Sequence, residues 1–92
     1  MKILIFGLPG SGKTTLANEL VKSLDAKSLN ADEVRKEYND WDFSSEGRTR
    51  QAKRMRHLAD EIVSTGGIAV VDFVCPTRET RKIFDGDFGI YL

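Results

Sequence analysis

A glycine-rich run near the amino terminus, Gly7 to Thr14, constrains what this chain can fold into more than any other feature. The run matches the pattern G-x-x-x-x-G-K-[ST], and it lies between an apolar stretch, Ile3 to Phe6, and a helix-like stretch, Thr15 to Leu20. In a strand–loop–helix of this kind, backbone N–H groups converge on an anion at the positive end of the helix dipole. The run therefore predicts a nucleotide-phosphate site. The alternative is a glycine-rich turn without a ligand, which the flanking strand and helix disfavour.

Two side chains of this run carry the expected chemistry. Lys13 supplies a mobile positive charge for the β- and γ-phosphates of ATP, and we expect it to act in catalysis. The Thr14 hydroxyl is placed to ligate Mg²⁺, so that ATP and Mg²⁺ are the expected cofactors. The residues predicted to surround the ATP phosphates are Gly7, Pro9, Gly10, Ser11, Gly12, Lys13, Thr14 and Thr15.

Apolar, β-prone stretches alternate with helical patterns along the whole chain. Strands are expected at Lys2–Phe6, Lys27–Leu29, Ile68–Val74 and Phe88–Leu92. Four helices are expected. The first runs from Lys13 to about Leu24, and a short second one follows Asn30 to Asp32 and continues through Tyr38. The third runs from a cap at Ser44 or Ser45 to a stop before Gly66, and the fourth from Arg78 to about Phe84. This alternation predicts an α/β fold, the three-layer α/β/α arrangement of P-loop NTPases, with about four parallel strands.

Length and composition limit the class of protein. The 92 residues make a single domain, 1–92, which is shorter than a usual doubly wound nucleotide-binding unit. We expect it to be the N-terminal portion of a larger domain, with a natural minimal unit as the alternative. The net charge of zero disfavours nucleic acid, and no apolar run reaches the ~20 residues of a membrane span. The single Cys75 fits a cytoplasmic protein, and an incomplete sheet edge would favour association with another chain.

Two carboxylates follow strands of the predicted sheet. Ligands of open parallel sheets gather at the carboxyl ends of the strands, so Asp32 and Asp72 should face the phosphate loop. We expect Asp32 to act in catalysis, by orienting an attacking hydroxyl or accepting its proton. Asp72 closes an apolar run and is expected to hold Mg²⁺, through water. The alternatives are an N-cap of the short helix for Asp32 and a strand-end carboxylate bonded to a backbone N–H for Asp72.

The long helix opens with a cluster of cations that suits an anionic acceptor. Arg48, Gln51 and Arg54, together with Arg35, are expected to hold that acceptor by charge-assisted hydrogen bonds. Phe43 and Phe73 are candidates to enclose a base. The alternatives are a solvated helix face for the cations and core positions for the two aromatic residues.

Four blocks of the sequence resemble the adenylylsulfate kinase family, whose members phosphorylate the 3′-hydroxyl of adenosine 5′-phosphosulfate (APS). The blocks are Gly7 to Thr15, Leu29 to Arg35, Phe43 to Arg48, and Phe73 to Arg78. In the family the second block reads Leu-Asp-Gly-Asp-x-Val-Arg, and the fourth reads Phe-Ile-Ser-Pro-x-Arg. The resemblance implies an enzyme of sulfate assimilation that transfers phosphate from ATP to APS, and it implies a homodimer. The residues predicted to bind the acceptor are Asp32, Arg35, Phe43, Arg48, Gln51, Arg54, Phe73 and Val74.

The chain departs from the family pattern at several positions. Asn30 stands where the family has its first aspartate, Gly47 replaces the aspartate before Arg48, and Asp72 occupies a position that is usually small and uncharged. Further departures are Arg50, Gln51 and Cys75. Two other functions therefore stay open: a P-loop kinase acting on a polynucleotide 5′-end or a small metabolite, and a partial module that binds ATP without turnover.

Overall fold

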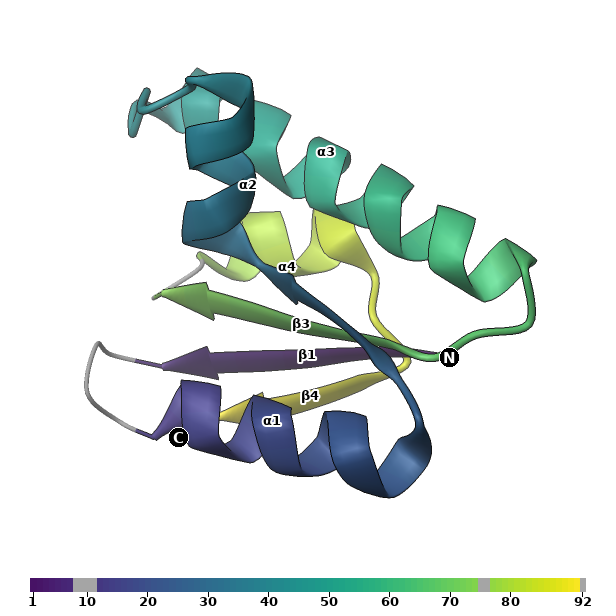
Figure 1. Cartoon of the computed structure of the whole chain (residues 1–92). Helices are drawn as coiled ribbons and strands as arrows, with labels where there is room; N and C mark the ends of the chain where they lie inside the picture. Colours follow the sequence, from purple (N-terminus) through teal and green to yellow (C-terminus); the bar gives the residue numbers. More distant parts are fainter. Residues whose placement is uncertain (8–11, 75–76, 92) are drawn as a thin grey trace.

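A computed structural model of the chain describes residues 1–7, 12–74 and 77–91. Among these residues, four parallel strands form one sheet in the order β2-β3-β1-β4 (Figure 1). The elements are β1 (Lys2–Gly7), α1 (Lys13–Leu24), β2 (Lys27–Asn30), α2 (Ala31–Tyr38), α3 (Ser45–Ser64), β3 (Ala69–Val74), α4 (Arg78–Phe84) and β4 (Phe88–Tyr91). Figure 1 shows α1 on one face of the sheet and α3, α4 and α2 on the other. The predicted three-layer α/β/α fold with a parallel sheet is confirmed.

Successive residues of the central strands pack against opposite faces of the sheet, as the period of two in a strand requires. Ile3 and Ile5 of β1 pack toward α1, whereas Leu4 packs toward α3. The core on the α1 face consists of Ile3, Ile5, Ala17, Ala26 and Val70. The larger core on the α3 face consists of Leu4, Ala31, Val34, Met55, Ala59, Ala69, Val71, Phe73 and Phe84. Both central strands are therefore buried on two sides, which explains their continuous apolar sequence.

The beginning of each helix is set by a residue suited to that place. Gly12 precedes α1 with a φ of 92°, a left-handed conformation that glycine adopts without strain. The side chains of Asn30, Ser44 and Thr77 accept hydrogen bonds from backbone N–H groups of α2, α3 and α4, respectively. The N-cap of α2 is thus Asn30, and the alternative role of Asp32 as that cap is wrong, because Asp32 already lies in the first helical turn.

Several predicted boundaries shift by a residue. β1 extends to Gly7 and β2 to Asn30, while β3 begins at Ala69 rather than at Ile68. The strands lengthen at their carboxyl ends because β3 lies between β1 and β2 and pairs with both as far as Val74 and Asp72. Predictions for Pro9, Gly10 and Ser11, and for the side chain of Val74, lie outside the described residues, as does the predicted strand end at Leu92.

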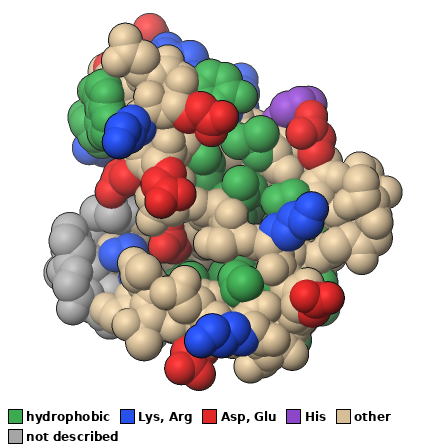
Figure 2. All heavy atoms as spheres, in the orientation of Figure 1, with side chains coloured by type: hydrophobic (Ala, Val, Ile, Leu, Met, Phe, Trp, Pro, Cys, Tyr) green, Lys and Arg blue, Asp and Glu red, His purple; other side chains and the backbone are tan. Residues whose placement is uncertain are grey.

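Acidic and basic side chains are interspersed on the face of the molecule that Figure 2 shows. Within residues 1–7, 12–74 and 77–91, every helix is too short or too polar to cross a membrane.

Candidate nucleotide and acceptor site

The carboxyl edge of the sheet, on the left in Figure 1, gathers the polar residues that follow β1, β2 and β3. Lys13 begins α1 directly after the phosphate loop and is buried. Asp72 is separated by two positions from Val70, so it belongs to the face of the sheet that α1 covers. The strand period therefore places this carboxylate on the side where Lys13 lies, and Asp72 is only 6% exposed.

The carboxyl group of Asp72 has polar partners on β2 and at the start of α2. Its Oδ1 accepts a hydrogen bond of 2.7 Å from Asn30 Nδ2, and the backbone N–H of Ala31 lowers the pKa of the carboxyl. Burial raises the pKa of Asp72, while the charge of Lys13 lowers it and the charge of Asp32 raises it. The charges of the other predicted carboxylate and of the predicted lysine thus both act on the pKa of Asp72.

Residues suited to Mg²⁺ are present at this edge. The Thr14 side chain is exposed in the first turn of α1, and Asp72 supplies a carboxylate near the carboxyl end of β3. Within the described part of the chain, no group of three or more His, Cys, Asp or Glu side chains is placed to hold a metal. This donor set fits Mg²⁺, which keeps several waters and takes one or two protein ligands beside the substrate phosphates.

Arg35, a predicted acceptor residue, supports the segment between α2 and α3. It is 5% exposed, and its Nη1 donates to the backbone carbonyls of Asp40 at 3.0 Å and Asp42 at 3.1 Å. Its guanidinium lies 4.4 Å from the ring centroid of Phe43, whose side chain is 55% exposed. Arg35 therefore shapes the loop that presents Phe43, because one guanidinium holds two carbonyls and stacks on a ring.

Gln51 and Arg54 connect this loop to the sheet edge. Gln51 is buried; its Nε2 donates to the carbonyl of Ala31 at 2.9 Å, and its Oε1 accepts from Arg54 Nη1 at 2.8 Å. Arg54 also bonds Asp40 at 2.9 Å. Four of the predicted acceptor residues, Arg35, Phe43, Gln51 and Arg54, thus belong to one connected group.

Asp40 is a site residue that the sequence did not indicate. Its carboxylate accepts hydrogen bonds from Arg50 Nε at 2.8 Å, from Arg50 Nη2 at 3.0 Å and from Arg54 Nη2 at 2.9 Å. Its partners lie 10 and 14 residues away, beyond the spacing of local helix pairs, so no sequence periodicity reveals them. Asp40 balances the charge of the cations that the acceptor was expected to meet.

Two further predicted acceptor residues, Arg48 and Phe73, have different surroundings. Arg48 is exposed on α3. Phe73 is 8% exposed and packs edge-on against Phe84, with ring centroids 6.0 Å apart, as its alternative role in the core requires. At Gly47, an added methyl group would collide with the backbone carbonyl of Asp42, which explains why the aspartate of the family pattern does not fit here.

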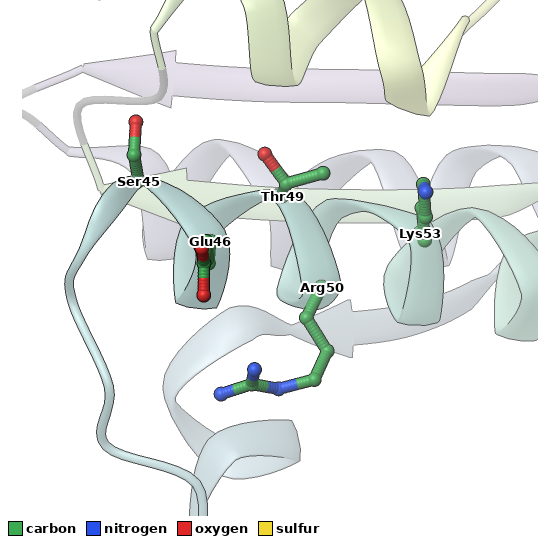
Figure 3. Close-up of a pocket in the computed structure, with 5 residues that line it drawn as sticks. All are labelled: Ser45, Glu46, Thr49, Arg50 and Lys53. Carbon is green, nitrogen blue, oxygen red and sulfur yellow. The ribbon is translucent and has the colours of Figure 1, made fainter.

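The first turns of α3 also line an open hollow of about 440 Å³. Its residues are Ser45, Glu46, Thr49, Arg50 and Lys53, and Figure 3 shows Arg50 extending away from Ser45 and Thr49. Arg50 bonds Asp40, so the hollow borders the group formed by Arg35, Phe43, Asp40, Gln51 and Arg54.

Asp40 should make the stability of the fold dependent on acidic pH. Hydrogen bonds from Arg50 and then Arg54 hold the pKa of its carboxyl well below the usual range. Because this pKa is lower in the folded than in the unfolded state, the carboxylate stabilises the fold above its unfolded pKa of about 4. The stabilisation is lost as the pH falls through the folded pKa. We therefore expect Asp40→Asn to be less stable than the wild type at pH 7.

The difference in unfolding free energy between the wild type and Asp40→Asn should become smaller as the pH falls below about 5. Urea unfolding of both proteins between pH 7 and pH 2 measures it. Asp25→Asn, which removes a charge from the exposed C-cap of α1, is the control and should show a smaller difference at pH 7. A difference between the wild type and Asp40→Asn that is unchanged at pH 2 would contradict the assignment.

Comparisons with known proteins show which family the chain belongs to. The family model described as adenylylsulphate kinase matches residues 1–86. The adenylyl-sulfate kinase of Bacillus licheniformis is 36% identical over 87 residues, covering 88% of this chain and 44% of that protein. The adenylyl-sulfate kinase of Staphylococcus haemolyticus is 37% identical over 93 residues, covering 89% of this chain and 47% of that protein.

Solved structures have a similar fold. The APS kinase of Mycobacterium tuberculosis, in complex with AMPPNP and APS, superposes with a TM-score of 0.85 at 26% identity, covering 98% of this chain and 60% of that one. A sugar kinase from Janibacter sp. HTCC2649 has a TM-score of 0.82 at 20% identity, covering 95% of this chain and 57% of that one, and shows the shared fold alone. The chain spans somewhat under half the length of these two curated relatives. By its sequence and its fold, the chain belongs to the adenylylsulfate kinase family.

Proposed function

We propose that this protein transfers the γ-phosphoryl group of ATP to the 3′-hydroxyl of APS. One observation carries the proposal: buried Lys13 at the start of α1, buried Asp72 near the end of β3 and exposed Asp32 in the first turn of α2 all belong to the carboxyl edge of the sheet. Phosphoryl transfer depends on positioning and on charge stabilisation, which such a group supplies. Family membership and the M. tuberculosis relative in complex with AMPPNP and APS support ATP and APS as the substrates.

The residues at this edge divide the work between nucleotide and acceptor. Lys13 and the N–H groups at the start of α1 hold the β- and γ-phosphates. Thr14 would hold Mg²⁺ directly and Asp72 through water, and the bound ion would neutralise charge on the phosphoryl oxygens. Asp32, exposed in the first turn of α2, orients the acceptor hydroxyl and takes its proton.

The acceptor itself would bind over the segment between α2 and α3. Arg35 holds this segment by donating hydrogen bonds to the backbone carbonyls of Asp40 and Asp42. The largely exposed ring of Phe43 then offers a surface to a planar base. Arg54 supplies a guanidinium beside it, linked through Gln51 to the start of α2. An anionic nucleotide combines the base and the negative charge that this surface can receive.

ADP release coupled to an optical readout tests the proposal, with APS present or absent. We expect APS to accelerate ADP release, and Asp32→Asn to lower the accelerated rate about 100-fold or more, because it removes the proton acceptor. Glu33→Gln, which neutralises the neighbouring exposed carboxylate, should keep most of the rate. ADP release that APS does not accelerate would exclude this acceptor. Acceleration by a 5′-hydroxyl oligonucleotide instead would establish the polynucleotide alternative.

A further inference from the structure

Asn30 and Asp72 are direct cross-strand neighbours whose side chains bond to each other. They are paired in the register of β2 and β3, and Asn30 Nδ2 donates to Asp72 Oδ1 at 2.7 Å. Asn30 Oδ1 accepts from the backbone N–H of Glu33 at 3.0 Å. The opposite orientation of this amide would set an oxygen against the carboxylate and an NH₂ group against the N–H. Both ends of the Asn30 amide are therefore engaged, and only one orientation satisfies them.

This double engagement restricts the carboxylate of Asp72. One of its oxygens is bonded to an amide that the first turn of α2 holds in place. Lys13 acts on the same carboxylate from the start of α1. Asp72 is thus held between two helix starts, one of which follows the phosphate loop.

We propose that Asn30 is a positioning residue for Asp72, and that the two side chains form one unit that presents a single negative charge to Lys13 and to Mg²⁺-bound ATP. The inference rests on the nucleotide site of the proposed function but not on the identity of the acceptor. In this unit the carboxylate comes from β3, and the amide on β2 sets its orientation. The protein should therefore tolerate an exchange of the carboxylate and the amide between positions 30 and 72. It should not tolerate two carboxylates or two amides at these positions equally well.

A set of three variants tests this pairing: Asn30→Asp, Asp72→Asn and the exchange variant that carries both changes. Two properties are measured for each protein: the melting temperature without ligand, and the Kd for ATP by calorimetry at saturating Mg²⁺. Asn30→Asp sets two carboxylates at hydrogen-bond distance and should melt lower, although aspartate caps a helix as well as asparagine does. Asp72→Asn keeps a hydrogen bond but loses the charge, so Mg²⁺-ATP should bind about tenfold more weakly.

The exchange variant should recover both properties. Its new amide on β3 would donate to its new carboxylate on β2, and that carboxylate would still accept from the N–H of Glu33. Each hydrogen bond is then kept and one negative charge remains. We expect its melting temperature to return to within a few degrees of the wild type, and its Kd to return to within about threefold, because residues in one network deviate from additivity. Asn18→Asp, which adds an exposed charge on α1, is the control and should change neither property.

Each outcome bears on a different statement. Effects of the two single changes that simply add in the exchange variant would overturn the pairing. An Asp72→Asn protein that binds Mg²⁺-ATP as the wild type does would show a purely structural carboxylate, and would also overturn it. Failure of the wild-type protein to bind Mg²⁺-ATP would overturn the proposed function. Normal Mg²⁺-ATP binding without transfer to APS would overturn only APS as the acceptor. The melting temperatures and Kd values of the three variants would still decide the pairing.

Discussion

Lys13→Ala is expected to weaken Mg²⁺-ATP binding by roughly 100-fold, since each lost charge-assisted hydrogen bond to a phosphate costs about 1.5–3 kcal/mol. Lys13 is the first residue of α1 and is 8% exposed, so it approaches the phosphates from a partly desolvated position where charge interactions are strong. Its removal also takes a positive charge away from the buried carboxylate of Asp72. We therefore expect a lower melting temperature of the unliganded protein as well.

Calorimetric titration with ATP at saturating Mg²⁺ measures this effect. Lys22→Ala is the matched control, because it removes an exposed lysine from the last turn of the same helix. That variant should bind Mg²⁺-ATP as the wild type does. A Kd for Lys13→Ala within about threefold of the wild-type value would show that the nucleotide is held elsewhere, which would remove the basis of the proposed function.

Phe84→Ala is expected to cause the largest loss of stability in this protein. The ring of Phe84 is fully buried at the end of α4, in edge-to-face contact with Phe73, and Lys2 Nζ lies 5.6 Å from its centroid. Replacing a buried phenylalanine with alanine costs about 3–5 kcal/mol, because the cavity collapses only in part. Domains of this size have a total stability of roughly 5–14 kcal/mol. The change should therefore remove a large fraction of it.

Thermal unfolding followed by circular dichroism measures this loss. At about 4–8 °C per kcal/mol for a domain of this size, the midpoint should fall by roughly 12–40 °C. Phe88→Ala is the matched control, because Phe88 on β4 is 59% exposed and should cost at most about 1 kcal/mol. Equal midpoints for the two variants would mean that the core on the α3 face does not pack around Phe84 as described.

The fold was predictable because its signals are local. Apolar runs such as Ile3 to Phe6, stop signals such as Gly66, and caps such as Ser44 and Thr77 act over a few residues, and the structure confirms each of them. The predicted boundaries that were wrong differ by a residue, because the neighbouring strand, and not the local sequence, decides how far pairing continues. Asp32 was wrongly considered as the N-cap of α2 for a similar reason. The strand β2 continues to Asn30, and α2 begins at the next residue.

The sequence by itself determined the kind of site: a phosphate loop between a strand and a helix, with carboxylates at the carboxyl ends of parallel strands. It also marked Asn30 and Asp72 as separate departures from the family pattern. Only the tertiary structure showed that these two side chains, 42 positions apart, bond to each other, and that Asp40 binds Arg50 and Arg54. The physical reason is that a helix or strand period reports which face a residue occupies. Which charge meets which partner is decided by strand register and helix packing, and these are properties of the assembled sheet.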